Sequence, residues 1–370
     1  MLAFMILIVV VLAFAWNLGV HYTGAVMGMP YAARAIALWP ALALIAVLTV
    51  LGATFGSGGV EATVGRRIIS DRAVTVPAAI AIVLAAGALT TLYNYWKVPT
   101  STIQILVFCV VGVALAGGIP IYWGTIGTLA VVWVCAPVVA FALGFAFTRL
   151  LDLIVPPAAA RAQIEAQAAT QTDSAAPPAA RSGWLARLLP GVARAWAADP
   201  ALAPYTASPA TQTVLRLLPA LLVLVGIGAS FVLGANDVAN ATGAFILTHR
   251  FSLTVAGLIG GLAMAVGALT WGQRILRTVA FDIVKMDLTM ASAAQGVQAL
   301  VVITAVSFGL FTSMNQALIG AMAGTGLARG RETVRRAQIA GILRGWLIGP
   351  LSGLALAFAL ESLVRLVARG

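Results

Sequence analysis

Residues 234–241 read Gly-Ala-Asn-Asp-Val-Ala-Asn-Ala and lie between two apolar runs, Leu217–Leu233 and Thr242–Leu247. An ionised side chain at the centre of a bilayer costs roughly 3 kcal/mol, and such residues usually mark the path of an ion or a proton. Asn240 follows Asp237 by about one helical turn, so both side chains can face one cavity. The small residues around Asp237 favour a helix that unwinds and frees carbonyl oxygens for a cation. The alternative interpretation is a polar pair that holds two helices together.

The composition of the whole chain agrees with a membrane setting. Of 370 residues, 61% are hydrophobic and only 9% are charged, whereas a soluble domain carries about 25% charged residues. No arrangement of layers could hide so much apolar surface from water, so lipid is the expected solvent. The net charge of +11 does not indicate a nucleic-acid partner. The arginines form short clusters between apolar runs, as they do in the cytoplasmic loops of membrane proteins.

We expect an all-α, polytopic membrane protein whose spans are apolar runs of about 20 residues. The first half offers candidate spans at 1–16, which could resume after a break and run to 33, and at 35–56, 74–96, 101–119 and 124–151. The second half offers candidates at 214–233, continuing after a break to about 248, and at 251–272, 291–309, 316–328 and 343–362. A polar stretch rich in Ala and Pro predicts a partly disordered linker loop. The expected regions are a first membrane repeat at 1–155, the linker loop at 156–212 and a second repeat at 213–370.

Four pairs of short motifs recur in the same order in the two halves. They are Gly65-Arg66-Arg67-Ile68 with Gly272-Gln273-Arg274-Ile275, residues 99–104 with 311–316, Trp133 and Pro137 with Trp346 and Pro350, and residues 17–25 with 233–241. The differences in residue number are 207, 212, 213 and 216. Each match alone is weak, but four in register indicate a duplicated fold, which is common among secondary transporters.

The charge distribution predicts the orientation of the chain. Five spans per half is an odd number, so the second half must be inverted relative to the first. The side that holds the linker loop receives 16 of the 22 lysines and arginines, and the other side receives 6. Because cytoplasmic loops are enriched in these residues, we expect a cytoplasmic linker loop and both termini outside, across a cell (inner) membrane. The sequence leaves open whether the turns near 97–101 and 310–316 are re-entrant.

The stretch 234–241 resembles the G-x-N-D-x-A-N-A signature of the inorganic phosphate transporter (PiT) family. The segment "WGQRILRTVAFDIVKMD" from Trp271 resembles the family's G-x-R-x-x-x-T segment, and "SFGLFTSMNQALIGAMAGTGLARG" from Ser307 stands where the family carries P-x-S-T-T-H. The resemblance covers most of both halves but not the linker loop. It implies cation-coupled oxyanion symport by two inverted repeats, with broken helices and hairpin turns near the midplane. Paired D-x-x-N motifs would bind the cation, and paired Ser/Thr turns would bind the anion.

The first half departs from the family pattern. Where the family has N-G-x-x-D-x-x-N-A, this chain reads Asn17-Leu18-Gly19-Val20-His21-Tyr22-Thr23-Gly24-Ala25. His21 replaces the acid and Gly24 replaces the second asparagine, which resembles the sulfate permease branch of the family. Sulfate carries no proton at neutral pH, so its site needs donors, and His21 offers a donor where a carboxylate would repel a dianion. A neutral packing role for His21 is the alternative.

The expected anion site consists of polar side chains near the two hairpin turns. Helix N-termini at these turns would add backbone N–H groups, which favour anions. The alternative is that serine and threonine merely bond back to their own helix. The candidate substrate-binding residues are Thr100, Ser101, Thr102, Thr312, Ser313, Asn315, Gln316, Asn17 and His21. The candidate cation-binding residues are Asp237, Asn240 and Asn236, of which Asp237 and Asn240 would hold Na+ in a sodium-coupled protein.

These residues predict secondary active transport of a small tetrahedral oxyanion by cation-coupled (Na+ or H+) symport, with sulfate as the favoured cargo. A phosphate symporter and a passive anion channel are the alternatives. An enzyme is not expected, because His21 and His249 belong to no recognisable nucleophile or metal constellation. No cofactor is expected beyond Na+ as a coupling ion. Lipid is an expected partner, nucleic acid is not, and a homodimer stays open.

Overall fold

The protein is a bundle of helices throughout the part of the chain that the structure describes. This computed structural model describes residues 1–56, 68–69, 74–172, 184–196, 208–246, 251–308, 312–330 and 333–369. The helices of the first half and linker are α1 (Leu2–Ala32), α2 (Leu38–Gly56), α4 (Val76–Trp96), α5 (Thr102–Gly117), α6 (Trp123–Asp152), α7 (Pro157–Thr172), α8 (Trp184–Leu188) and α9 (Pro190–Trp196). The second half contains α10 (Pro209–Ile246), α11 (Leu253–Thr270), α12 (Gly272–Phe281), α13 (Leu288–Ser307), α14 (Met314–Arg329) and α15 (Arg336–Arg369).

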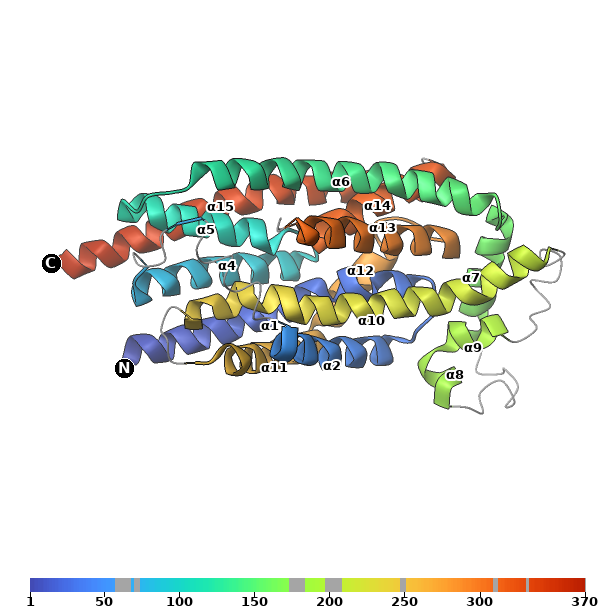
Figure 1. The fold of residues 1–370 in the computed structure, drawn as a ribbon, viewed down its shortest axis with the longest axis horizontal. Helices are drawn as coiled ribbons and strands as arrows, with labels where there is room; N and C mark the ends of the chain where they lie inside the picture. Colours follow the sequence, from blue (N-terminus) through green and yellow to red (C-terminus); the bar gives the residue numbers. More distant parts are fainter. Residues whose placement is uncertain are drawn as a thin grey trace.

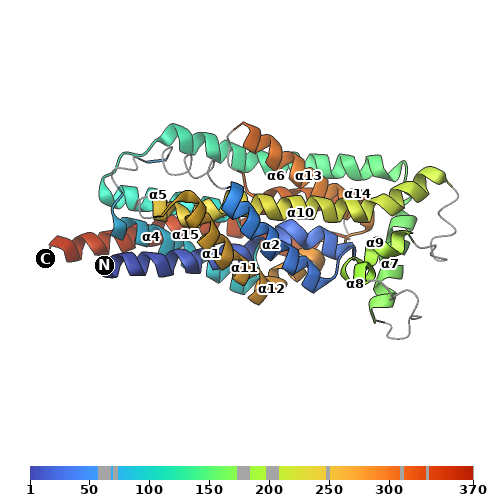
Figure 2. The same ribbon diagram turned by 60° about the horizontal axis from the view of Figure 1, so that its bottom comes forward.

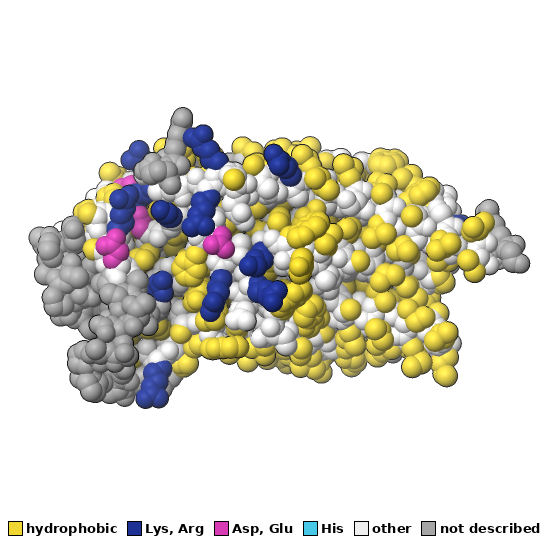
Figure 3. All heavy atoms as spheres, turned by 180° about the vertical axis from the view of Figure 1, so that it is seen from behind, with side chains coloured by type: hydrophobic (Ala, Val, Ile, Leu, Met, Phe, Trp, Pro, Cys, Tyr) yellow, Lys and Arg dark blue, Asp and Glu magenta, His cyan; other side chains and the backbone are white. Residues whose placement is uncertain are grey.

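The long helices run side by side along one axis of the molecule (Figure 1). Among the described residues, eight helices are long and apolar enough to cross a membrane, so the chain is a multi-pass membrane protein. Both termini lie at one end of the bundle and α7, α8 and α9 lie at the other, in Figure 1 and again in Figure 2. On the face shown in Figure 3, lysine and arginine gather on the half that leads to α7–α9, and the other half is largely hydrophobic. We therefore propose that the α7–α9 end is cytoplasmic.

Two pairs of helices form hairpins that turn halfway along the bundle. The pair α4 and α5 lies in the half that holds the termini, and the pair α13 and α14 lies in the half toward α7–α9 (Figure 1). Helices α5 and α14 contain 16 residues each, which is about 24 Å of helix and falls short of a hydrocarbon core of about 30 Å. We propose that α4 with α5, and α13 with α14, are re-entrant hairpins, so that each half has three full crossings and one hairpin among its about five expected spans. The crossings are α1, α2 and α6 in the first half, and α10, α11 with α12, and α15 in the second.

Two contacts between the halves correspond to each other, one between α5 and α15 and one between α14 and α6. A Cβ atom added to Gly112 of α5 would overlap the carbonyl oxygen of Leu354 on α15. One added to Gly324 of α14 would overlap the carbonyl oxygen of Phe141 on α6. The glycines differ by 212 in residue number and their partners by 213, the same differences that relate the sequence motifs. We propose on this basis that the halves are inverted repeats, in which each hairpin packs against the last crossing of the other half.

Two of the expected helix breaks are wrong. Helix α1 continues through residue 16 to Ala32, and α10 continues through the whole stretch 234–241. No proline follows Pro219 within α10, and alanine, which is frequent there, is the strongest helix former. The small residues around Asp237 therefore extend the helix rather than unwind it. The break in the second half comes instead at Trp271, between α11 and α12.

The described part of the linker segment, 156–172, 184–196 and 208–212, is largely helical. Residues 156–212 contain α7, α8, α9 and the start of α10, because the alanine-rich composition that resembles a disordered tract also favours a helix. Side-chain hydrogen bonds tie this segment to the bundle. The Gln163 side chain donates to the carbonyl oxygen of Leu215 at 3.2 Å, and the Thr211 hydroxyl donates to that of Ile154 at 2.6 Å.

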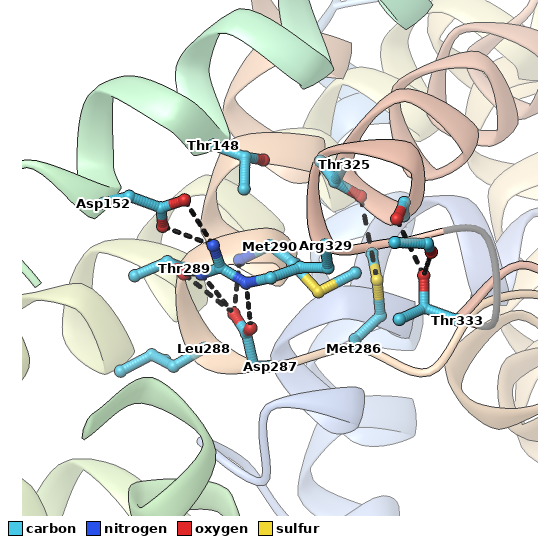
Figure 4. Close-up of polar contacts among 12 residues, drawn as sticks. Thr148, Asp152, Met286, Asp287, Leu288, Thr289, Met290, Thr325, Arg329 and Thr333 are labelled. Atoms are coloured by element: carbon cyan, nitrogen blue, oxygen red, sulfur yellow. Dashed lines mark hydrogen bonds and ion pairs between the residues drawn. The ribbon is translucent and has the colours of Figure 1, made fainter. Parts of the chain in front are cut away.

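A buried ion cluster holds the base of the second hairpin (Figure 4). Arg329, at the end of α14, donates from Nε to Asp287 at 2.6 Å and from Nη2 to the hydroxyl of Thr289 at 2.6 Å, and it also pairs with Asp152 at the end of α6. Asp287 in turn accepts the backbone N–H of Met290 at 2.9 Å in the first turn of α13. A buried charge is stable only with its partners in place, so this cluster fixes both ends of the hairpin to the first half.

Candidate functional site

The tips of the two hairpins have the same local structure. Ser101 precedes α5 and its Oγ accepts the backbone N–H of Gln104, while Ser313 precedes α14 and accepts that of Gln316, each at 3.4 Å. A serine oxygen that caps a helix in this way keeps its own O–H to donate elsewhere. The Gln104 and Gln316 side chains exchange two hydrogen bonds, both of 3.1 Å. The N-termini of α5 and α14 therefore meet at the centre of the protein.

Two buried hydroxyls at these tips have no hydrogen-bond partner. They belong to Thr100 and Thr312, which occupy equivalent places one residue before the capping serines. The tips are held together by Asn315, whose side chain donates to the carbonyl oxygen of Thr100 at 3.0 Å. Buried polar atoms are almost always paired, so an unpaired hydroxyl in each repeat-related turn points to a ligand that carries acceptors.

The arrangement of the tips suits a small anion. Thr100, Ser101 and Ser313 are at most 1% exposed, so an anion there would be largely removed from water. Hydroxyl donors and the positive ends of two helix dipoles converge on it. We propose that the anion binds between the tips. The predicted residues Thr100, Ser101, Thr102, Ser313, Asn315 and Gln316 all lie at these two tips and are buried there.

The acidic site lies on α10. The side chain of Asn240 donates to the Asp237 carboxylate at 3.3 Å, and both side chains are buried. This is the pairing that their spacing predicted. Asn236 is half-buried on the same helix and takes no part in that hydrogen bond. We propose that Asp237 and Asn240, rather than Asn236, hold the coupling cation.

Tyr22 connects the acidic site with the anion site. Its hydroxyl lies 2.8 Å from the hydroxyl of Thr102, the first residue of α5, and it also interacts with the Asp237 carboxylate. The residue is 1% exposed. Sequence reasoning missed Tyr22, because an aromatic residue in an apolar helix usually serves packing. The signal that could have identified it is its position directly after His21, which stands where the family carries an acid.

His21 belongs to a fixed polar network rather than to an open donor site. Its Nδ1 lies 2.6 Å from Oδ1 of Asn94, and its Nε2 lies 3.1 Å from the backbone N–H of Thr100. Asn94 donates its amide to the backbone and side-chain oxygens of Asn17, so its Oδ1 must accept and His21 must carry the proton on Nδ1. Both ring nitrogens are then occupied. We propose that His21 and Asn17 position the first hairpin instead of donating to the anion.

Two glutamines on α13 were also missed. Gln298 donates to the carbonyl oxygens of Ala25 at 2.9 Å and Met314 at 3.2 Å, and Gln295 donates to Gln298 at 2.7 Å. They tie the second tip to α1, and the Gln295 oxygen is buried without a partner. Two amides one turn apart in an apolar segment were the available signal, since such groups are costly in a membrane unless they are paired.

Comparison with known proteins places this geometry in a family. A model of the phosphate transporter family matches residues 3–357. The chain belongs to the phosphate transporter family. The match spans both halves, and it confirms the resemblance that residues 234–241 carry.

Individual members of the phosphate transporter family resemble the chain over most of its length. The sulfate permease CysP of Bacillus subtilis (strain 168) is 25% identical over 354 residues, covering 95% of this chain and 85% of that protein. The chloroplastic inorganic phosphate transporter 2-1 of Arabidopsis thaliana is 26% identical, covering 90% of this chain and 67% of that protein. A solved structure, described as the sodium-dependent phosphate transporter, matches with a TM-score of 0.75 at 22% identity, covering 99% of this chain and all of that one. That likeness establishes the fold.

Proposed function

We propose that this member of the phosphate transporter family is a secondary active transporter that carries sulfate together with a coupling cation, Na+ or H+. The observation that carries the proposal is the meeting of two hairpin tips, each with a buried and unpaired threonine hydroxyl, close to the acidic pair Asp237 and Asn240. Tyr22 contacts both groups, since its hydroxyl lies 2.8 Å from that of Thr102 and it interacts with the Asp237 carboxylate.

The cation half of the proposal rests on ligand chemistry. A carboxylate and an amide oxygen suit a hard cation such as Na+, and a buried carboxylate can equally take up a proton. The solved relative is described as sodium-dependent, which supports Na+. Movement of the two hairpin-bearing halves against each other would then expose the site to either side in turn.

The choice of sulfate rests on the donor character of the tips. Protonated phosphate would bring a donor that needs an acceptor, and the side-chain oxygens of Gln104 and Gln316 already accept from each other. An unpaired acceptor remains on α13, the buried oxygen of Gln295. The first-half acid of the family is replaced by His21, and Asp237 is engaged with Asn240 and Tyr22. CysP, one of the relatives, is described as a sulfate permease. Phosphate transport is the runner-up, because other relatives are described as phosphate transporters.

Competition between anions tests the choice of cargo. Labelled sulfate uptake into proteoliposomes should be suppressed by unlabelled sulfate at concentrations about ten to a hundred times lower than those of phosphate, because one unmatched buried donor costs about 1–3 kcal/mol. Protein-free liposomes supply the background. Phosphate that competes as well as sulfate does would reverse the assignment and make phosphate the cargo.

A further inference from the structure

One hydroxyl group lies between the acidic site and the anion site. The Tyr22 oxygen is 2.8 Å from the Thr102 oxygen and also interacts with the Asp237 carboxylate. These side chains come from α1, α5 and α10. All three are buried, with exposed fractions of 1% for Tyr22, 0% for Thr102 and 7% for Asp237.

The number of protons in this chain of groups is limited. Tyr22 and Thr102 carry one hydroxyl proton each. A carboxylate without a bound cation is a strong hydrogen-bond acceptor, so the Tyr22 hydroxyl donates a hydrogen bond to Asp237. The Tyr22 oxygen then accepts a hydrogen bond from the Thr102 hydroxyl. In that state Thr102 has no proton to offer an anion at the tip.

A cation bound to Asp237 reverses the direction of the hydrogen bond between Tyr22 and Thr102. When the carboxylate binds a cation through its oxygens, it competes less well for the tyrosine proton. Tyr22 can then donate to Thr102, and Thr102 is free to donate its own proton to an anion beside Ser101. No covalent bond is made or broken, since only the hydroxyl rotors turn.

We propose that Tyr22 is the positioning residue that couples the two sites, by releasing the Thr102 hydroxyl to the anion only when a cation occupies Asp237. This inference rests on the proposed function and names the residue that would couple its two ligands. By linkage, the anion in turn strengthens the binding of the cation by the same factor. The direct attraction between cation and anion adds to this coupling and does not pass through Tyr22.

The Tyr22→Phe variant tests the coupling, because the inference predicts tighter sulfate binding without the cation, whereas a purely structural role of Tyr22 predicts weaker binding. Phenylalanine keeps the ring and removes the hydroxyl, so Thr102 loses the acceptor that occupies it in the cation-free state. Equilibrium binding of labelled sulfate to the purified full-length protein is measured with and without saturating Na+ at fixed pH, and then at two pH values without Na+. Sulfate should bind Tyr22→Phe about tenfold more tightly than wild type when the cation is absent. The factor by which the cation tightens sulfate binding should shrink by the same amount.

Two further variants serve as controls. Tyr31→Phe makes the same change on the same helix, where the ring packs edge-on against Phe281, and it should bind sulfate as wild type does. Thr102→Val removes the donor itself, so it should weaken sulfate binding at high cation concentration. Adding Tyr22→Phe to Thr102→Val should then produce no tightening in the absence of the cation.

The outcomes separate this inference from the proposed function. If Tyr22→Phe weakens sulfate binding equally with and without the cation, Tyr22 has only a structural role and the inference is wrong, while the proposed function stands. If neither Na+ nor pH alters sulfate binding to the wild type, the proposed coupling itself fails and the inference falls with it.

Discussion

An Asp237→Asn variant is expected to fold normally and to accumulate no sulfate above its external concentration. The amide has nearly the shape of the carboxylate and can still interact with Asn240, which hydrogen-bonds to Asp237 at 3.3 Å. It carries no charge, so it can neither balance a bound cation nor take up a proton. The steady-state accumulation ratio in proteoliposomes should therefore fall to about 1, because without coupling the gradient supplies no free energy to the anion.

The control for this variant is Asp282→Asn, which makes the same substitution outside the site. Asp282 pairs with Arg335 at 3.5 Å, and both side chains are about half exposed, so the pair contributes little to stability. This variant should accumulate sulfate as wild type does. If Asp237→Asn, reconstituted at matched density, reaches the wild-type accumulation ratio, Asp237 plays no part in coupling.

A Ser101→Ala/Ser313→Ala double variant is expected to lose most of its affinity for sulfate. Each serine accepts a backbone N–H through its oxygen, and we propose that it donates its own O–H to the anion. A hydrogen bond to a charged ligand contributes about 1.5–3 kcal/mol, so each single variant should raise the dissociation constant about tenfold to a hundredfold. If the two tips act on one anion, the double variant should lose about a hundredfold or more.

Loss of a helix cap must be separated from loss of a donor. Ser252 caps α11 by accepting the N–H of Val255 at 3.3 Å, outside the hairpin tips, so Ser252→Ala loses a comparable cap worth about 1 kcal/mol. It should change thermal stability in detergent without changing sulfate affinity. A double variant that binds sulfate no worse than Ser252→Ala would exclude the tips as the anion site.

The sequence predicts which residues make up the candidate site better than it predicts how they are arranged in space. An acidic residue in an apolar run has a high free-energy cost in the bilayer, so Asp237, with Asn240 one turn later, could be identified from the sequence alone. The hydroxyl-bearing residues around Ser101 and Ser313 could be identified because they occupy equivalent positions in the two repeated motifs. The structure places both groups of residues near one another, although they come from separate segments of the chain.

The path of the backbone was harder to predict. A short helix such as α5 has the same apolar composition as a full crossing, so turns within the membrane could not be distinguished by sequence from loops outside it. The glycines and other small residues near Asp237 suggested unwinding, but the alanines among them stabilise a helix, and α10 runs through the whole stretch. Tyr22 was missed for a different reason, since the contacts that distinguish it are with Thr102 and Asp237, which lie far away in sequence and on other helices.

Gradient-driven uptake of labelled sulfate by wild-type protein in proteoliposomes tests the central claim most directly. Vesicles receive an inward Na+ gradient, an inward proton gradient or neither, and internal sulfate is followed until it is constant. We expect internal sulfate to rise above the external concentration with one of the gradients and to fall back when an ionophore collapses it. Sulfate that only equilibrates with the external solution, at the same final level under all three conditions, would contradict coupled transport and indicate a passive anion channel.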